Sequence, residues 1–171
     1  MTALPGPAAR LFLAAGEGVA GTAPARPVVM LSAAHPPGDT RVVRKEGAAL
    51  AAAGWRVVHL CPGANRARIA GVEIVPHRHR RLRGLWALAR DAAALRPAVI
   101  HASEPDAWLA ALLAGWRSGA RVVLDVHEHY PSRLDARLPA VLRPLARTAI
   151  GLACRAMGLA ADAVVVAKDG L

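Results

Sequence analysis

The sequence predicts an α/β fold, a Rossmann-like doubly wound parallel sheet in a single domain, and three observations support this prediction. Short apolar runs alternate with amphipathic segments over residues 27–171, which is the rhythm of strand–helix–strand units with right-handed crossovers. The runs are apolar on both faces, as strands covered on both sides of a sheet must be. With 171 residues, of which 54% are hydrophobic, the chain is long enough to bury one core.

The elements follow from local patterns. Strands are predicted in chain order at 28–31, 55–61, 72–75, 98–101, 122–124 and 163–167. Helices are predicted between them, over 41–53, over 82–95, from Pro105 onward, and in two pieces that begin near Pro139 and Pro144 and end near Gly158.

The helix boundaries rest on capping signals. Asp39 or Thr40 is the expected N-cap of the first helix. Ser103 is expected to cap the helix that starts at residue 105, with Asp106 in the capping-box position. The large apolar residues of that helix are expected to form its buried face: Leu109, Leu112, Leu113 and Trp116.

Residues 1–26 are rich in Pro, Gly and Ala and predict a flexible leader before the domain at 27–171. Within the leader, Gly16, Gly18 and Gly21 match the spacing of a dinucleotide-binding fingerprint. That fingerprint needs a helix that opens at its third glycine. Because prolines follow at once, we interpret the match as chance.

The net charge is +10, and 20 of the 22 basic residues are Arg. No zinc-finger, helix-turn-helix or RNA-binding signature accompanies this charge, so we do not expect nucleic acid as a partner. The basic run His77–Arg81 and the stripe Arg143, Arg147 and Arg155 are either solvated surfaces or contacts for anionic lipid headgroups or an acceptor phosphate.

Two distant cysteines, Cys61 and Cys154, predict neither a disulfide framework nor a metal site. No apolar run reaches the ~18 residues of a membrane span. These observations predict a cytoplasmic protein. Walker, nucleophile-elbow and zinc motifs are also missing from the sequence, so ATP-loop and hydrolase-elbow chemistry lack support.

Candidate functional residues gather after three of the predicted strands. In a doubly wound sheet, the carboxyl ends of such strands meet at one edge, where ligands bind. The polar residues after the first strand are Ser32, His35, Gly38, Asp39, Thr40 and Arg41; those after the fourth are His101, Ser103, Glu104 and Asp106; those after the fifth are Asp125, His127, Glu128, His129 and Tyr130.

Several of these residues have a structural alternative. Asp39 can be a helix cap, Glu104 can favour a helix dipole, His101 can be a core residue, and Asp125 can bond backbone amides. The pair His127 and Glu128 is harder to explain structurally, because a dense carboxylate and imidazole cluster favours a functional site.

Three segments together resemble the amino-terminal domain of family 4 glycosyltransferases of the GT-B class. They are Pro37–Arg41 with the helix that follows and ends at Gly54, Val99–Asp106, and Val123–Pro131, and the last of these is the most specific. The resemblance covers about residues 27 to 171.

The resemblance implies an acceptor-binding half of a glycosyltransferase that moves a hexose-type sugar from a nucleotide sugar to a glycan or a lipid-linked acceptor. It implies that His127 and Glu128 are catalytic. It implies a cleft that faces acceptor and donor phosphate, lined by Gly38, Asp39, Thr40, Arg41, His101, Glu104, Asp125 and Tyr130. It implies no metal and no cofactor beyond the nucleotide-sugar donor.

In that family a second, carboxyl-terminal domain binds the nucleotide sugar, and residues 27–171 do not supply it. We therefore expect inactivity without a second domain or a second chain as partner, and we expect peripheral contact with the inner membrane face. The alternatives are a non-catalytic binding or scaffold domain with the same fold, or half of a sugar-nucleotide epimerase.

Overall fold

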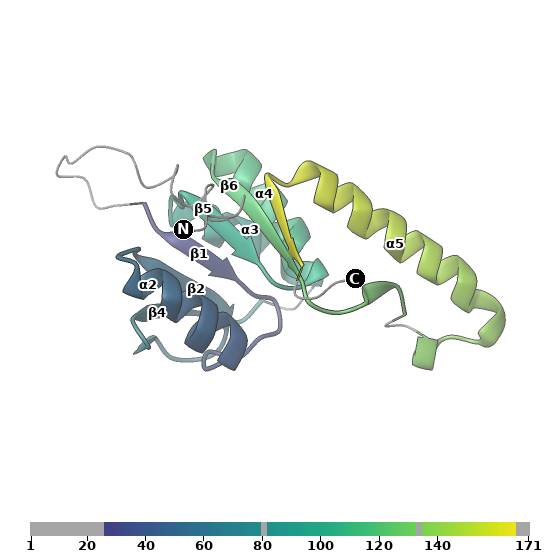
Figure 1. Cartoon of the computed structure of the whole chain (residues 1–171), viewed down its shortest axis with the longest axis horizontal. Helices are drawn as coiled ribbons and strands as arrows, with labels where there is room; N and C mark the ends of the chain where they lie inside the picture. The colour runs from purple at the N-terminus through teal and green to yellow at the C-terminus, as the bar shows by residue number, and fades with distance from the viewer. Residues whose placement is uncertain (1–25, 80–81, 133–134, 167–171) are drawn as a thin grey trace, which may run out of the picture.

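The computed structural model describes residues 26–79, 82–132 and 135–166, and these residues form an α/β fold with one sheet (Figure 1). The strands are β1 (Val28–Leu31), β2 (Val57–Pro62), β3 (Ala67–Ile69), β4 (Val72–His77), β5 (Val99–Ala102), β6 (Arg121–Val126) and β7 (Ala163–Val166). The helices are η1 (Thr40–Gly47), α2 (Ala48–Ala52), η2 (Leu82–Gly84), α3 (Leu85–Ala94), α4 (Pro105–Ser118), η3 (Tyr130–Ser132), η4 (Asp135–Arg137), η5 (Ala140–Leu142) and α5 (Arg143–Ala160).

The strand order within the described residues is β3-β4-β2-β1-β5-β6-β7. All pairs are parallel except β3 with β4, which is antiparallel. The chain first adds strands on one side of β1 and then returns to add β5 on the other side. The order therefore reverses between β1 and β5, and ligands of such sheets bind beside the carboxyl ends of the strands at this reversal.

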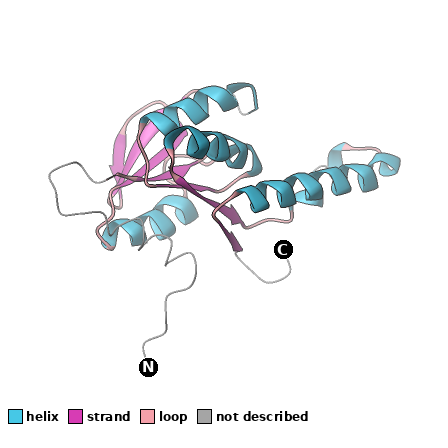
Figure 2. Cartoon of the chain, turned by 90° about the horizontal axis from the view of Figure 1, so that it is seen from above, coloured by secondary structure: helices cyan, strands magenta, loops and turns pink. Residues whose placement is uncertain are grey.

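Helices cover both faces of the sheet, as Figure 2 shows. One face carries η1 and α2, where Val42 and Val43 join Val28 and Met30 in a buried cluster. The other face carries α3, α4 and α5. All four residues of β1 are fully buried, because the central strand contacts both layers.

These observations confirm the predicted fold class, a Rossmann-like α/β sheet. They also add one strand and one change of helix type to the sequence prediction. The short strand β3 was not predicted, because its three residues, Ala67–Ile69, are too few to show an apolar pattern. The first helix begins as the π-helix η1, whose N-cap is Asp39, one of the two predicted caps.

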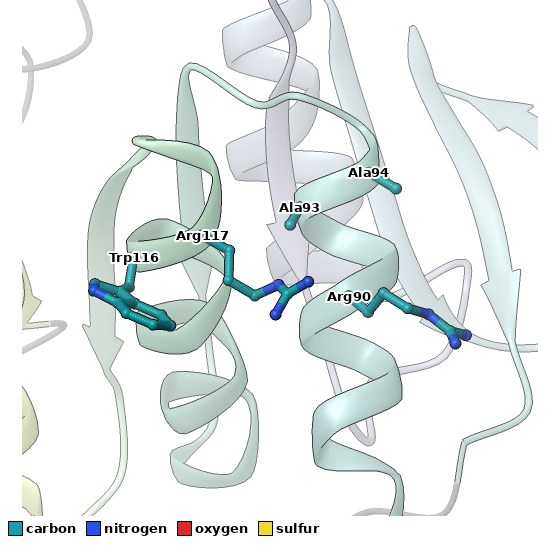
Figure 3. Close-up of a pocket in the computed structure, with 5 residues that line it drawn as sticks. All are labelled: Arg90, Ala93, Ala94, Trp116 and Arg117. Atoms are coloured by element: carbon teal, nitrogen blue, oxygen red, sulfur yellow. The ribbon is translucent and has the colours of Figure 1, made fainter.

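The buried face of α4 was predicted only in part: Leu112 and Leu113 are partly buried against the core, as expected, but Leu109 and Trp116 are not. Leu109 and Trp116 are 43% and 82% exposed, and the buried residues are mostly small: Ala107, Trp108, Ala110, Ala111, Ala114 and Gly115. A Cβ added to Gly115 would lie 2.5 Å from Val122 Cγ2, so the small residues allow close packing on β6. Trp116 instead lies on the surface near Arg117 and Arg90 (Figure 3).

The cap of α4 also differs from the prediction. The N-cap is Glu104 rather than Ser103, and Glu104 makes no side-chain cap bond. Its carboxylate instead accepts backbone N–H groups of the loop after β1. Pro144 lies in the first turn of α5, as expected, and Pro139 is the N-cap of the short helix η5.

The leader at 1–26 and its three glycines lie outside the described residues, apart from Arg26, whose guanidinium donates to the carbonyls of Arg96 and Pro97. Among the residues described, no helix is both long and apolar enough to cross a bilayer.

Candidate functional site

Three loops converge at the carboxyl edge of the sheet, after β1, β5 and β6. The parallel register sets Leu31 beside Ala102 and Ala102 beside Leu124. The chain therefore leaves three adjacent strands at the same level. The predicted site residues follow these positions, so the structure brings most of them together.

Glu104 organises the loop after β1. Its carboxylate is 6% exposed and accepts backbone N–H groups of Ala33, Ala34 and His35 at 3.3, 3.1 and 3.0 Å. The Nε2 atom of His35 also lies 3.4 Å from Glu104 Oε1. One buried carboxylate thus satisfies three donors of an irregular loop, which fixes the loop between β1 and η1.

Asp39 continues this loop into η1. Its side chain accepts the backbone N–H groups of Arg41 and Val42 at 2.9 and 2.8 Å, and its Oδ2 lies 3.1 Å from His35 Nδ1. Burial by itself would raise the pKa of Asp39, but the hydrogen bonds from Val42 and His35 outweigh it and hold the pKa below its usual value. Asp39 is therefore a helix cap that carries its charge at neutral pH.

Arg41 links the first loop to β6. Its Nη2 donates to both carboxylate oxygens of Asp125, at 2.7 and 2.9 Å. Asp125 is fully buried, whereas Arg41 is 35% exposed. The Nε of Arg41 lies 2.9 Å from Glu46 Oε1. A buried carboxylate of β6 thus holds one guanidinium at the rim of the site.

His127 lies next to this ion pair. Its side chain is 13% exposed, and its Nδ1 is 3.3 Å from Asp125 Oδ2. The ring stands 5.8 Å from the His35 ring and 6.2 Å from the Tyr130 ring, measured between centroids. Among the described residues, His127 Nδ1 has no aligned hydrogen-bond partner. The imidazole therefore contacts Asp125 without an aligned hydrogen bond at Nδ1.

Tyr130 supports this wall of the site. The side chain is buried, its hydroxyl donates to the Ser103 carbonyl at 3.2 Å, and its ring packs edge-on against Trp108 at 5.1 Å. Trp108 in turn donates its Nε1 hydrogen to the Ala102 carbonyl at 3.1 Å. Tyr130 thus ties the loop after β6 to the loop after β5.

Glu128 follows His127 but is exposed and borders a different space. A cavity of about 300 Å³ lies between α5 and strands β6 and β7. Its wall is mostly apolar and is formed by Trp108, Leu124, Val126, Tyr130, Pro131, Gly151, Cys154, Gly158, Val164 and Val166, with Glu128 and His129 as its polar members. Glu128 therefore belongs to the mouth of an apolar cavity, beside the charged cluster.

His101 lies in β5 beneath the cluster and is 7% exposed. Burial lowers the pKa of His101 to about 4, although the nearby Asp125 carboxylate opposes the shift, so the ring is neutral at pH 7. Its Nδ1 is 4.0 Å from Glu46 Oε2. The structural alternative for His101, a buried core residue, agrees with this environment, and its contact with Glu46 connects it to the site.

Gly38 and Thr40 are exposed residues of the loop and of the first turn of η1. They form the outer rim of the edge that contains Asp39 and Arg41. A Cβ added to Gly38 would meet nothing within 4 Å, so the space next to this glycine is open.

Glu46 is the member of this cluster that sequence reasoning missed. It lies five residues after Arg41, a spacing that does not bring side chains together on an α-helix. The π-helical backbone of η1 is what brings them together, and the sequence contains no clear signal for that backbone.

The basic segments differ from a simple solvated surface. His77 is buried in β4, and His79 pairs with Asp91 at 2.7 Å; Arg80 and Arg81 lie outside the described residues. Arg147 pairs with Asp135, and Arg143 donates to the Leu138 carbonyl at 3.1 Å. Several charges of both segments are thus used within the chain.

In the described part of the chain, no three His, Cys, Asp or Glu side chains converge as metal ligands. The residues of the cluster pair with one another and with backbone amides. An anionic or hydroxyl-bearing ligand is the chemistry that Arg41 and His127 can recognise there.

The comparison with protein families agrees with this geometry. Residues 38–170 match the family described as glycosyl transferase 4-like domain. The chain therefore belongs to this family, and the match begins at the loop that carries Asp39 and Arg41. A search among curated proteins finds no match for the chain.

Proposed function

We propose that this domain is the acceptor-binding half of a glycosyltransferase that moves a hexose-type sugar from a nucleotide sugar to a glycan or a lipid-linked acceptor. The observation that carries the proposal is the convergence of Arg41, Asp125 and His127 at the sheet edge where ligands of this fold bind, in a chain of the glycosyl transferase 4-like family.

His127 and Glu128 are the catalytic residues of this proposal. Asp125 lies close enough to orient the His127 imidazole through Nδ1, which leaves Nε2 to bond a hydroxyl of the acceptor or of the sugar. Arg41 neutralises Asp125, so the carboxylate orients the ring without placing a net negative charge beside a phosphate. Gly38, Asp39, Thr40, His101, Glu104 and Tyr130 shape the cleft around them.

The nucleotide-sugar donor binds to a second domain or a second chain that closes over this edge. In the complete reaction the bond between the sugar and the nucleotide phosphate breaks, and a new bond forms to the acceptor oxygen, which loses its proton. Without the donor-binding part, the domain at 27–171 binds acceptor and does not turn over.

The cavity beside Glu128 supports an acceptor with an apolar portion. A volume of about 300 Å³ with a largely apolar wall suits a segment of a hydrocarbon chain. A lipid-linked acceptor would place that segment under α5 and its polar head near His127. This arrangement also supports a cytoplasmic protein in peripheral contact with the inner membrane face.

The test is a binding measurement on the purified chain. A prenyl-phosphate-linked sugar in detergent micelles is titrated against it, and UDP-glucose is titrated separately. We expect saturable binding of the lipid-linked sugar and none of the nucleotide sugar. Binding of UDP-glucose, or binding of neither probe, would contradict the acceptor-half proposal, and the second result would favour a non-catalytic scaffold.

A matched pair of variants locates the apolar portion. Cys154→Phe places a large ring in the cavity wall, whereas Ala153→Phe adds the same ring on the exposed side of α5. We expect the first variant to weaken binding of the lipid-linked sugar at least tenfold and the second to leave it unchanged, with circular dichroism confirming that both fold. Equal affinity of the two variants would mean that the cavity does not hold the acceptor.

A further inference from the structure

The first helix after β1 has an unusual backbone. The carbonyl of Asp39 accepts the N–H of Val43 at 3.0 Å and that of Arg44 at 3.3 Å, and the N–H of Ala48 bonds back to the Val43 carbonyl. Bonds between residues five apart define a π-helix, which is rare and is concentrated at functional sites. Here it occupies all eight residues of η1.

This backbone brings Arg41 and Glu46 together. Five residues along an α-helix turn roughly 140° beyond one full turn, so the two side chains would point in different directions. The wider turn of a π-helix, with its bonds between residues five apart, reduces this angular separation. The Nε of Arg41 accordingly lies 2.9 Å from Glu46 Oε1, on the side that faces β5 and β6.

Charged and titratable groups face Glu46 from every neighbouring element. Arg41 lies on the same helix, and Asp39 is the cap of that helix. Asp125 faces Glu46 from β6. His101 faces it from β5, with its Nδ1 4.0 Å from Glu46 Oε2. Among the described residues, that Oε2 and that Nδ1 have no hydrogen-bond partner. Burial and the Asp125 charge raise the pKa of Glu46 to about 7, against the opposing effect of Arg41.

We propose that Glu46 is a positioning residue of the acceptor cleft. When Glu46 is ionised, Arg41 has two carboxylate partners, and when Glu46 is protonated, Arg41 has one. This inference rests on the proposed function, because it assigns a role within the same cleft. The π-helix is the structural device that makes the switch, since it is what brings the second carboxylate to the guanidinium.

The switch acts through Arg41 on the rest of the cluster. With Glu46 ionised, the guanidinium is shared between Glu46 and Asp125. With Glu46 protonated, Asp125 holds the guanidinium alone. Because Asp125 Oδ2 also faces His127 at 3.3 Å, each change at Glu46 alters the charge that the imidazole experiences. The positioning of His127 is therefore coupled to pH near neutrality.

His101 provides a direct test. Its ring stays neutral above pH 5, because burial lowers its pKa to about 4, so a change in its signals near pH 7 must come from a neighbouring group. We expect the ring signals of His101 in an NMR titration of the wild-type chain to show a step near pH 7. We expect Glu46→Gln to abolish this step.

The control variant is Glu73→Gln, which removes a carboxylate from an outlying ion pair with Arg56 and Arg68. It should leave the His101 step intact. A step that persists in Glu46→Gln, or a wild-type titration without a step near pH 7, would overturn the inference. Even if Glu46→Gln fails to fold, the absence of a step near pH 7 in the wild-type titration would overturn the inference.

The role in the cleft has its own readout. Binding of the prenyl-phosphate-linked sugar by the wild-type chain should change between pH 6 and 8, and Glu46→Gln should remove that change. An unaltered pH profile in Glu46→Gln would overturn the positioning role. If the wild-type chain binds no acceptor, the proposed function fails, whereas the His101 step still decides whether Glu46 controls the cluster.

Discussion

Two groups of buried and half-buried polar side chains lie toward the carboxyl edge of the sheet, and they differ in charge. The neutral group consists of Ser32, His59 and His77 and lies on the side of β2 and β4. The charged group consists of Arg41, Glu46, His101, Asp125 and His127 and lies on the side of β5 and β6.

The neutral group is mostly hydrogen-bonded. His59 Nε2 pairs with Ser32 Oγ at 3.1 Å, and His77 Nε2 donates to the Ser32 carbonyl at 2.9 Å. The backbone N–H of His79 donates to His77 Nδ1 at 3.3 Å, which fixes the neutral tautomer of that ring. These bonds tie together the ends of three strands, as buried polar groups of structural origin do.

Some buried side-chain nitrogen and oxygen atoms have no aligned hydrogen-bond partner among the described residues, and most of them belong to the charged group. Those of the charged group are Arg41 Nε, Glu46 Oε2, His101 Nδ1 and His127 Nδ1. Buried polar atoms whose contacts are poorly aligned cost stability unless a ligand or water satisfies them. The comparison therefore teaches that one half of this edge is closed by hydrogen bonds, whereas the other half consists of ion pairs in which several polar atoms are poorly aligned.

The largest effect is expected for Asp125→Asn, which tests the charged group directly. It removes the fully buried charge that holds Arg41, and we expect a loss of about 3 kcal/mol in the free energy of unfolding, because one partner of a buried ion pair is lost. Urea denaturation at pH 7 measures it. The matched change Glu73→Gln, in an exposed pair, should cost less than about 1 kcal/mol; equal losses would contradict the distinction.

The next effect concerns His59 in the neutral group. Burial lowers the pKa of His59 to about 4, from its usual value of 6.5. The unfolded chain therefore binds a proton below pH 6.5 that the folded chain does not. The stabilisation from the neutral ring is complete above pH 6.5 and is lost as pH falls toward 4, by about 2 kcal/mol at pH 5.

Urea denaturation at pH 7 and pH 5 measures this loss. Between pH 7 and pH 5, the free energy of unfolding of His59→Gln should fall by about 2 kcal/mol less than that of the wild type. A His59 variant with the wild-type pH dependence would show that this ring is not held neutral by burial.

The smallest effect is expected for Glu46, which is partly exposed. Its pKa is raised to about 7 from 4.5, mainly by burial. The unfolded chain releases this proton near pH 4.5 and the folded chain near pH 7, so ionisation of Glu46 lowers stability as pH rises through this window. With solvent screening we expect a cost of about 1 kcal/mol above pH 7.

Glu46→Gln should remove this cost. Relative to the wild type, the variant is expected to gain stability as pH rises from 5 to 8, which thermal denaturation at the two pH values measures. A difference between variant and wild type that does not vary with pH would argue against a raised pKa at Glu46, and would also weaken the proposed switch at Arg41.

The sequence by itself determined the fold class and the place where the polar cluster gathers. Apolar runs that alternate with helices predict a parallel sheet, and the carboxyl ends of its strands predict where Asp39, Arg41, Asp125 and His127 meet. These predictions depend on periodicity and connectivity, which are local properties of the chain. The capping role of Asp39 is local for the same reason.

Only the tertiary structure decided which face of α4 is buried, because the close approach of β6 favours Gly115 and alanines over Leu109 and Trp116. It also decided that His127 joins the charged group while Glu128 borders the apolar cavity. Finally, the tertiary structure placed Glu46 next to Arg41, because the π-helical backbone changes which side chains share a face. Packing between distant segments selects among these arrangements, and no local pattern encodes that selection.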